Sequence, residues 1–174
     1  MKIAATLRVN GTDYPVELDP HVSLLKAVRE ELGLTGSKEG CDDSECGACM
    51  MLLDGEPVNA CSYLALQAEG RDVTTVEGLA GDEEVGPLQR AFLEQAGVQC
   101  GFCTPGMLVS ATALLRHTPD PTEEEIRIGL SGNLCRCTGY RGIVRAVRQV
   151  ASGEVLPLGN APVHADATPP HHAG

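Results

Sequence analysis

The eight cysteines of this chain fall into two sets, whose spacing constrains the fold more than any other feature of the sequence. The first set has the pattern C-x4-C-x2-C, with a fourth cysteine after eleven more residues: Cys41, Cys46, Cys49 and Cys61. The second set joins a C-x2-C to a later C-x-C: Cys100, Cys103, Cys135 and Cys137. Aromatic residues make up only 3% of the 174 residues, so the core is thin, and small chains with thin cores often depend on bound metal or cross-links.

The spacing of the first set is typical of plant-type [2Fe–2S] ferredoxins. Small residues accompany these cysteines at Gly40, Ser44, Gly47 and Ala48. A loop around a cluster needs little side-chain bulk, because backbone N–H groups must approach the sulfur atoms. Zinc would favour two C-x2-C pairs, and this set has only one, while disulfides would need an oxidising compartment. The first set therefore predicts an iron–sulfur site.

The second set of cysteines precedes two predicted helices. Thr104 is a candidate N-cap with Pro105 as the first helical residue, and Thr138-Gly139 precedes the other helix. If these helices lie side by side, both N-termini face one point, where their partial positive charge favours thiolates. Spacing alone leaves two alternatives to a cluster, which are a zinc site and a strained disulfide between Cys135 and Cys137.

The first part of the chain has the short alternating runs of strands, and the second part, from about Asp82, has helical periodicity. Strands are predicted at 5–9, 14–18, 50–53, 57–58 and 73–76, and helices at 24–32, 62–68, 85–95, 105–117, 122–129 and 140–150. Ser23 is the candidate N-cap of the first helix. The predicted fold class is α+β, with a β-rich domain at 1–78, a helical domain at 79–152 and a flexible or partner-bound tail at 153–174.

The formal net charge of −11 argues against a nucleic-acid partner, because a phosphate backbone would be repelled. The first eleven residues have no apolar signal segment, and no run reaches the ~18 apolar residues of a membrane span. We therefore expect a cytoplasmic protein without a membrane span. In that compartment clustered cysteines more often bind metal or perform redox chemistry than form disulfides.

Three motifs around the cysteines resemble those of the small iron–sulfur subunit in the xanthine oxidase family of molybdenum hydroxylases. They lie at residues 39–49, 99–106 and 132–140, and read EGCDDSECGAC, QCGFCTPG and GNLCRCTGY. The resemblance covers about residues 3–150, nearly everything except the tail. It identifies the second cysteine set, like the first, as a [2Fe–2S] site.

The resemblance implies an N-terminal β-grasp, ferredoxin-like domain and a C-terminal four-helix-bundle-like domain. It implies a non-catalytic subunit of an oxidoreductase that relays electrons from a molybdenum–pterin cofactor through two [2Fe–2S] clusters to FAD. A large subunit would hold the molybdenum–pterin, as its cytosine dinucleotide, and a medium subunit the FAD, in a heterotrimer or a pair of heterotrimers. Gln99 matches a residue that hydrogen-bonds the pterin, and Cys137 matches the cluster ligand nearest to it. The alternative for Gln99 is a polar residue that satisfies its own loop.

Asp42 and Ser44 depart from the pattern of many family members, which have glycine at both positions. The form found here resembles the bacterial carbon monoxide dehydrogenase-like branch, and it is expected to change hydrogen bonding at the first cluster. Four arginines gather near the second set in an otherwise acidic chain: Arg136, Arg141, Arg145 and Arg148. They either face an anionic cofactor or partner subunit, or form an ordinary solvated helix face.

Two other functions remain as alternatives. The chain could be a free-standing two-cluster ferredoxin that serves several enzymes, or a zinc-stabilised interaction module without a redox role. Co-purification with other subunits would distinguish a subunit of a complex from a free-standing ferredoxin. Metal analysis would identify a zinc-stabilised module, which would contain zinc and no acid-labile sulfide. No nucleophile–base pair or general acid–base site is recognisable in the sequence, so substrate chemistry is expected in another chain.

Overall fold

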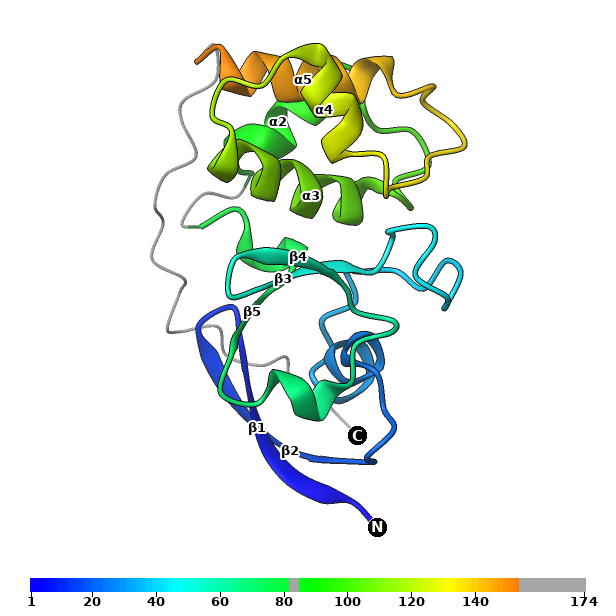
Figure 1. Cartoon of the computed structure of the whole chain (residues 1–174), viewed down its shortest axis with the longest axis vertical. Helices are drawn as coiled ribbons and strands as arrows, with labels where there is room; N and C mark the ends of the chain where they lie inside the picture. The colour runs from blue at the N-terminus through cyan, green and yellow to red at the C-terminus, as the bar shows by residue number, and fades with distance from the viewer. Residues whose placement is uncertain (82–84, 154–174) are drawn as a thin grey trace.

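A computed structural model describes residues 1–81 and 85–153 of the chain. A five-stranded sheet forms the N-terminal half, and four helices follow it, so the predicted α+β class is confirmed (Figure 1). Helix α3 (Thr104–His117) lies against the sheet, and α2 (Pro87–Glu94), α4 (Glu123–Gly129) and α5 (Arg141–Ala151) pack on its other side (Figure 1). The predicted tail lies outside the described residues, except for Gly153.

The sheet has the strand order β2-β1-β5-β3-β4. Its strands are β1 (Ile3–Val9), β2 (Thr12–Leu18), β3 (Met50–Leu53), β4 (Glu56–Asn59) and β5 (Asp72–Thr74). Strands β1 and β5 run parallel, and the other neighbours are antiparallel. Asn10 and Gly11 have positive φ angles of 50° and 77°, as the predicted tight turn requires. Pro15 lies on the edge strand β2, where its missing N–H costs no ladder bond.

The helix predicted at 24–32 consists of a short α-helix α1 (Leu24–Lys26) that continues as a π-helix (Ala27–Glu31). The predicted N-cap is confirmed, since the Ser23 hydroxyl accepts the Lys26 N–H at 3.3 Å. The helix predicted at 62–68 is shorter, a 3₁₀ helix at Ala65–Ala68, and a second 3₁₀ turn lies at Val76–Gly78.

The starts of the later helices follow local capping chemistry. Helix α4 begins with the predicted capping box, in which the Thr122 N–H donates to Glu125 Oε2 at 2.7 Å. The predicted cap of α3 is wrong, because Cys103 is the N-cap and Thr104 is the first helical residue. The reason is that the backbone of Cys103 already has right-handed helical angles, so the helix begins one residue earlier.

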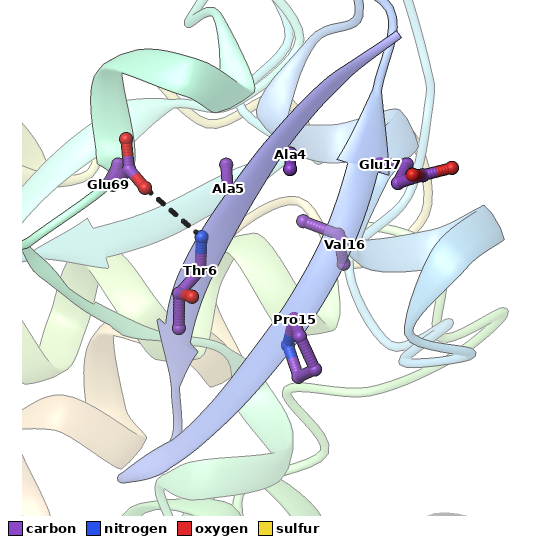
Figure 2. Close-up of a pocket in the computed structure, with 7 residues that line it drawn as sticks. All are labelled: Ala4, Ala5, Thr6, Pro15, Val16, Glu17 and Glu69. Carbon is purple, nitrogen blue, oxygen red and sulfur yellow. Dashed lines mark hydrogen bonds between the residues drawn. The ribbon is translucent and has the colours of Figure 1, made fainter.

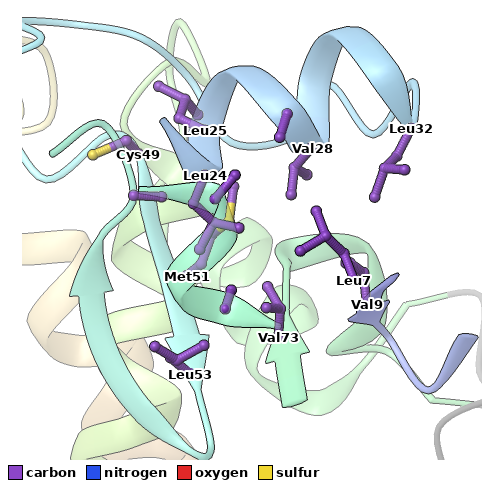
Figure 3. Packing of buried hydrophobic residues seen from close by; sticks show 14 of the residues in the cluster. Leu7, Val9, Leu24, Leu25, Val28, Leu32, Cys49, Met51, Leu53 and Val73 are labelled. Atoms are coloured by element: carbon purple, nitrogen blue, oxygen red, sulfur yellow. The ribbon is translucent and has the colours of Figure 1, made fainter. Parts of the chain in front are cut away.

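Buried apolar side chains form three groups, one in each half of the molecule and one between the halves. One fills the space between the sheet and α1, where Cys49 lies at its margin (Figure 3). A second joins the four helices around Phe92 and Ile143. The third is the domain contact, where Leu52 of β3 packs against Val109 and its neighbours on α3. Burying each such side chain contributes about 1.5–3 kcal/mol, so this contact fixes α3 and the loops at its N-terminus relative to the sheet.

Candidate metal centres

The first cysteine set is brought together by the loop between α1 and β3, with Cys61 arriving after the β3–β4 hairpin. Its thiols meet in two pairs. The Cys46 N–H and side chain contact Cys41, with 3.4 Å from Cys46 N to Cys41 Sγ, and the side chain of Cys49 contacts Cys61. The loop can close this tightly because Gly40 has no Cβ. A Cβ at this position would lie only 2.8 Å from Cys46 Sγ.

Burial and hydrogen bonds shift the pKa values of three thiols in the first set. Burial raises the pKa of the Cys49 thiol to about 12, and it also raises the pKa of Cys46. At Cys41 the Asp43 side chain raises the pKa, but the backbone N–H groups of Asp43 and Cys46 outweigh it and leave the pKa lowered. Cys49 is therefore a thiol in the metal-free chain, and a bound cation must displace its proton.

The second cysteine set converges at the N-terminus of α3. Cys100 Sγ and Cys137 Sγ lie 3.6 Å apart, and the side chain of Cys103 contacts Cys135, so this set also forms two pairs. Burial, followed by the contact with Cys135, raises the pKa of Cys103 to about 12. Cys103 is the N-cap of α3, while Cys135 and Cys137 lie in the loop before α5, so the two halves of the motif meet at the start of α3.

Residues after the C-x-C motif hold the second set by hydrogen bonds. The Thr138 hydroxyl lies 3.1 Å from Cys135 Sγ, and the Cys135 N–H donates to the Tyr140 hydroxyl at 2.8 Å. Burial raises the pKa of Cys135, but hydrogen bonds from Thr138 outweigh it, so the pKa is lowered overall. Sequence reasoning missed these roles of Thr138 and Tyr140, although both belong to the quoted motif. The sequence feature that could have revealed these roles is a hydroxyl-bearing residue within three positions of a cysteine at the start of a helix.

The paired arrangement fits a two-iron core, in which each iron takes two thiolates. A zinc ion would draw all four thiolates to one centre. Among the residues that the structure describes, no group of three His, Cys, Asp or Glu side chains is arranged to hold a single metal ion. All eight cysteines are free thiols. The buried hydroxyl of Thr104, the residue after Cys103, has no hydrogen-bond partner among the described residues.

Gln99 lies on the surface next to the exposed Cys100. Its side chain makes no hydrogen bond within the described ranges, so it does not satisfy its own loop. Cys137 is exposed as well. Two large apolar side chains near these residues are also exposed, Phe102 at 47% and Leu134 at 56%. The second site therefore opens to the surface through a partly apolar rim.

The four arginines near the second set divide into two groups. Arg145 donates to Gln95, and Arg148 pairs with Asp120 at 3.3 Å. Arg136 and Arg141 are exposed and pair with no group in residues 1–81 and 85–153. The solvated-face interpretation thus holds for Arg145 and Arg148, while the other two remain available for an external anion.

A shallow pocket of about 400 Å³ lies far from the cysteines in the sequence, on β1 and β2. It is formed by residues 4–6 and 15–17 with Glu69, whose carboxylate accepts the Thr6 N–H at 3.2 Å (Figure 2). It contains no cysteine and no pair of polar side chains aimed at one point, so the candidate chemistry lies at the two thiol sites. No helix in the described part of the chain is long and apolar enough to cross a membrane.

Two family models match the chain in succession. The 2Fe-2S iron-sulfur cluster binding domain matches residues 7–80, and the [2Fe-2S] binding domain matches residues 75–148. The fold and the paired thiols thus define a protein with two [2Fe–2S] sites.

Comparison with known proteins shows to which family of two-site iron–sulfur proteins the chain belongs. The small FeS subunit of nicotinate dehydrogenase from Eubacterium barkeri is 50% identical over 147 residues, covering 84% of this chain and 94% of that subunit. The small subunit of nicotine 6-hydroxylase from Paenarthrobacter nicotinovorans is 48% identical, covering 84% and 88%. The crystal structure of quinoline 2-oxidoreductase from Pseudomonas putida 86 superposes with a TM-score of 0.84 at 43% identity, covering 88% of this chain and 94% of that one. The chain belongs to the small iron–sulfur subunits of the xanthine oxidase family of molybdenum hydroxylases.

Proposed function

We propose that this chain is the electron-transfer subunit of a heteromeric molybdenum hydroxylase and relays electrons from a molybdenum–pterin cofactor through two [2Fe–2S] clusters to FAD. Relatives named as small FeS subunits support a role beside larger subunits. When bound, each cluster takes up and gives back one electron. The first cluster would be held by Cys41, Cys46, Cys49 and Cys61, and the second by Cys100, Cys103, Cys135 and Cys137.

The observation that carries this proposal is the direct contact between the two thiol sites. The Leu134 N–H donates to the Cys46 carbonyl at 2.9 Å, and Leu134 is followed by Cys135. A single hydrogen bond therefore links the backbones that carry one cysteine of each set. Two structural metal sites would need no such proximity, whereas a relay does, because electron tunnelling slows steeply with distance.

Exposure supports the order of the relay. Cys100 and Cys137 are exposed, and with Gln99 they would face the molybdenum–pterin subunit. Cys49 and Cys61 are buried, which suits an inner position. We propose the cytosine dinucleotide form of the pterin, a medium FAD subunit, a heterotrimer or its dimer, and a cytoplasmic location on the family resemblance alone.

The domain layout is likewise part of the proposal. The parallel pairing of β1 with β5 and the crossing of α1 over the sheet support a β-grasp, ferredoxin-like domain at 1–78. Helices α2–α5 support a four-helix-bundle-like domain at 79–152. The two family models overlap at residues 75–80, which supports a boundary near residue 78.

The test is purification of the native complex, followed by iron, sulfide and zinc analysis and by EPR of the reduced sample. We expect co-purifying molybdenum and flavin subunits, iron with equimolar acid-labile sulfide, and two distinct paramagnetic species. A monomer that carries both clusters without partners would favour the free-standing ferredoxin. Zinc without sulfide would refute the redox role.

A further inference from the structure

The peptide groups of Cys46 and Gly47 are the point where the two cysteine loops meet. Besides the bond from Leu134 to Cys46, the side-chain amide of Asn133 donates to the Gly47 carbonyl at 3.0 Å. Cys46 belongs to the first set, and Leu134 adjoins Cys135 of the second. Any shift at this contact therefore displaces one set of thiols relative to the other.

Asn133 is suited to hold this contact rigidly. Its side chain is 2% exposed, and its hydrogen bond joins residues 86 positions apart in the chain. The Asn133 N–H in turn donates to the Leu130 carbonyl at 3.0 Å, which anchors the residue to the end of α4. Breaking a buried hydrogen bond is unfavourable when one partner stays unsatisfied, so the Gly47 carbonyl is held in place.

Glycines allow the backbones to approach from two further directions. A Cβ at Gly106, in the first turn of α3, would lie only 2.1 Å from the Gly47 carbonyl oxygen. Gly47 itself has a φ of +67°, and its own Cβ would lie 2.3 Å from the Gly132 carbonyl oxygen. Glycine inside a helix is unfavourable relative to alanine, and the close approach of the Gly47 carbonyl oxygen is the steric reason for glycine at position 106.

Apart from the partly exposed Phe102 ring, which lies near Gly40, the other contacts described between the domains are distant from the cysteines. His117, at the opposite end of α3, lies 3.0 Å from the Glu56 carboxylate on β4. The apolar contact of Leu52 with Val109 lies between the two ends of α3. The contacts along α3 hold the domains together without defining the separation of the cysteine loops, whereas the buried hydrogen bond at Gly47 joins the two loops directly.

We propose that Asn133 and Gly106 are positioning residues that clamp the Cys46–Gly47 segment and thereby fix the separation of the two clusters. The inference rests on the proposed function, since it takes each thiol set to hold one cluster. Neither residue is a cluster ligand. Their contribution is a fixed, short distance, which keeps electron transfer between the two sites fast.

The experiment compares Asn133→Ala and Asn133→Asp with a matched control, Ser131→Ala, in the full chain purified with its partner subunits. Ser131 lies in the same loop, but its exposed hydroxyl donates only to the nearby Ile128 carbonyl at 2.7 Å. The readout is the spin–spin splitting between the two clusters in EPR spectra of the fully reduced protein, together with iron content and Tm. We expect decreased splitting in Asn133→Ala and its loss in Asn133→Asp, where a carboxylate oxygen faces the Gly47 carbonyl. The control should keep the splitting, and all three variants should keep both clusters.

A lower Tm with unchanged splitting would mean that Asn133 is only structural, and it would overturn the proposal. Gly106→Ala is the independent check, because the added methyl group must displace the Gly47 carbonyl and so weaken the splitting. Loss of a cluster from Asn133→Ala, which removes no ligand, would also contradict a role in spacing. A wild-type protein with only one paramagnetic species would instead refute the two-cluster function itself.

Discussion

The two thiol sites use the same number of cysteines in contrasting surroundings. In the first site, Cys49 is 1% and Cys61 8% exposed, and both are part of the core of the sheet domain. In the second site, Cys100 and Cys137 are exposed at the surface. An exposed ligand can lie directly against a partner subunit, whereas a buried ligand contacts only its own chain. The first site is thus buried on the side of Cys49 and Cys61 and half-buried on the side of Cys41 and Cys46, whereas the second site has two exposed ligands.

The charges around the two sites differ as well. The first loop carries exposed acidic residues at Asp42, Asp43 and Glu45, whereas the second site is flanked by Arg136 and Arg141. A positive patch on a chain of net charge −11 favours a partner surface of negative charge. The two loops should therefore face different partner surfaces, in agreement with a relay that has an entrance and an exit.

The largest expected difference between the sites concerns loss of a ligand. Cys49→Ser should remove the first cluster and lower Tm strongly, because a hydroxyl is then buried in the core and the metal is lost. Cys137→Ser should remove the second cluster with a smaller decrease in Tm, because its surroundings are exposed. Iron content, EPR and thermal unfolding measure both effects. Equal decreases in Tm would contradict the contrast in burial.

A rise in pH should destabilise the metal-free chain at both sites. The pKa of Cys49 and of Cys103 is raised by burial from 9.0 to about 12. Each thiol keeps its proton longer in the folded state, so its contribution to stability is complete below pH 9.0 and is lost as the pH rises towards about 12. The pKa values of Cys41 and Cys135 are lowered from 9.0. These two thiols therefore add stability to the folded chain as the pH rises towards 9.0.

Urea unfolding of the metal-free chain at pH values below and above 9.0 measures this effect. The metal-loaded chain is the control, since its ligands are already deprotonated and its stability should change less over the same range. A metal-free chain that gained stability on passing into the alkaline range would show that the thiols are not buried as described.

Removal of one hydrogen bond should alter the second site alone. In Thr138→Val the hydroxyl that donates to Cys135 Sγ is lost, and hydrogen bonds to charged groups contribute about 1.5–3 kcal/mol. Because this bond favours the more negative, reduced state, the reduction potential of the second cluster should fall. Redox titration followed by EPR measures it, with Thr138→Ser as the variant that keeps the hydroxyl. An equal shift at both clusters would show that the effect is not local.

The smallest expected effect concerns the charged surface. Arg136→Glu combined with Arg141→Glu should weaken assembly with the partner subunits, by about 0.2–1 kcal/mol for each exposed charge pair lost. The effect should diminish at high salt. Arg145→Glu is a poor control, because Arg145 binds Gln95 within the chain, so Lys2→Glu on the opposite domain is preferable. Assembly that does not respond to the double substitution would assign these arginines to ordinary solvation.

Much of the secondary structure follows from local patterns. The Thr122 capping box, the Asn10-Gly11 turn and the extent of α3 were all predictable, because caps, turns and apolar periodicity act within a few residues. The cap of α3 was not predictable in detail, because Thr104 has the right residue type but the backbone of Cys103 already has helical angles, which places Thr104 inside the helix. The π-helical end of α1 likewise has no local signal, and packing of Ala27 and Val28 against the sheet determines it.

The departures from glycine at Asp42 and Ser44 can be explained only with the backbone conformation of the first cysteine loop. Both residues have positive φ angles, 60° and 68°, a conformation that favours glycine. A left-handed conformation costs a non-glycine residue roughly 1–2 kcal/mol. Ser44 also gains a hydrogen bond to the Ser62 hydroxyl beside Cys61, which ties the first loop to its fourth cysteine.

The sequence by itself determined the chemistry of this protein, because thiol number and spacing restrict which metal groups a loop can hold. Only the tertiary structure decided which thiols pair, which site is buried, and that Asn133 and Gly106 meet the loop of Cys46 across the domain boundary. Such contacts join residues far apart in the chain. Their geometry depends on how α3 packs on the sheet, and no local pattern of residues contains that information.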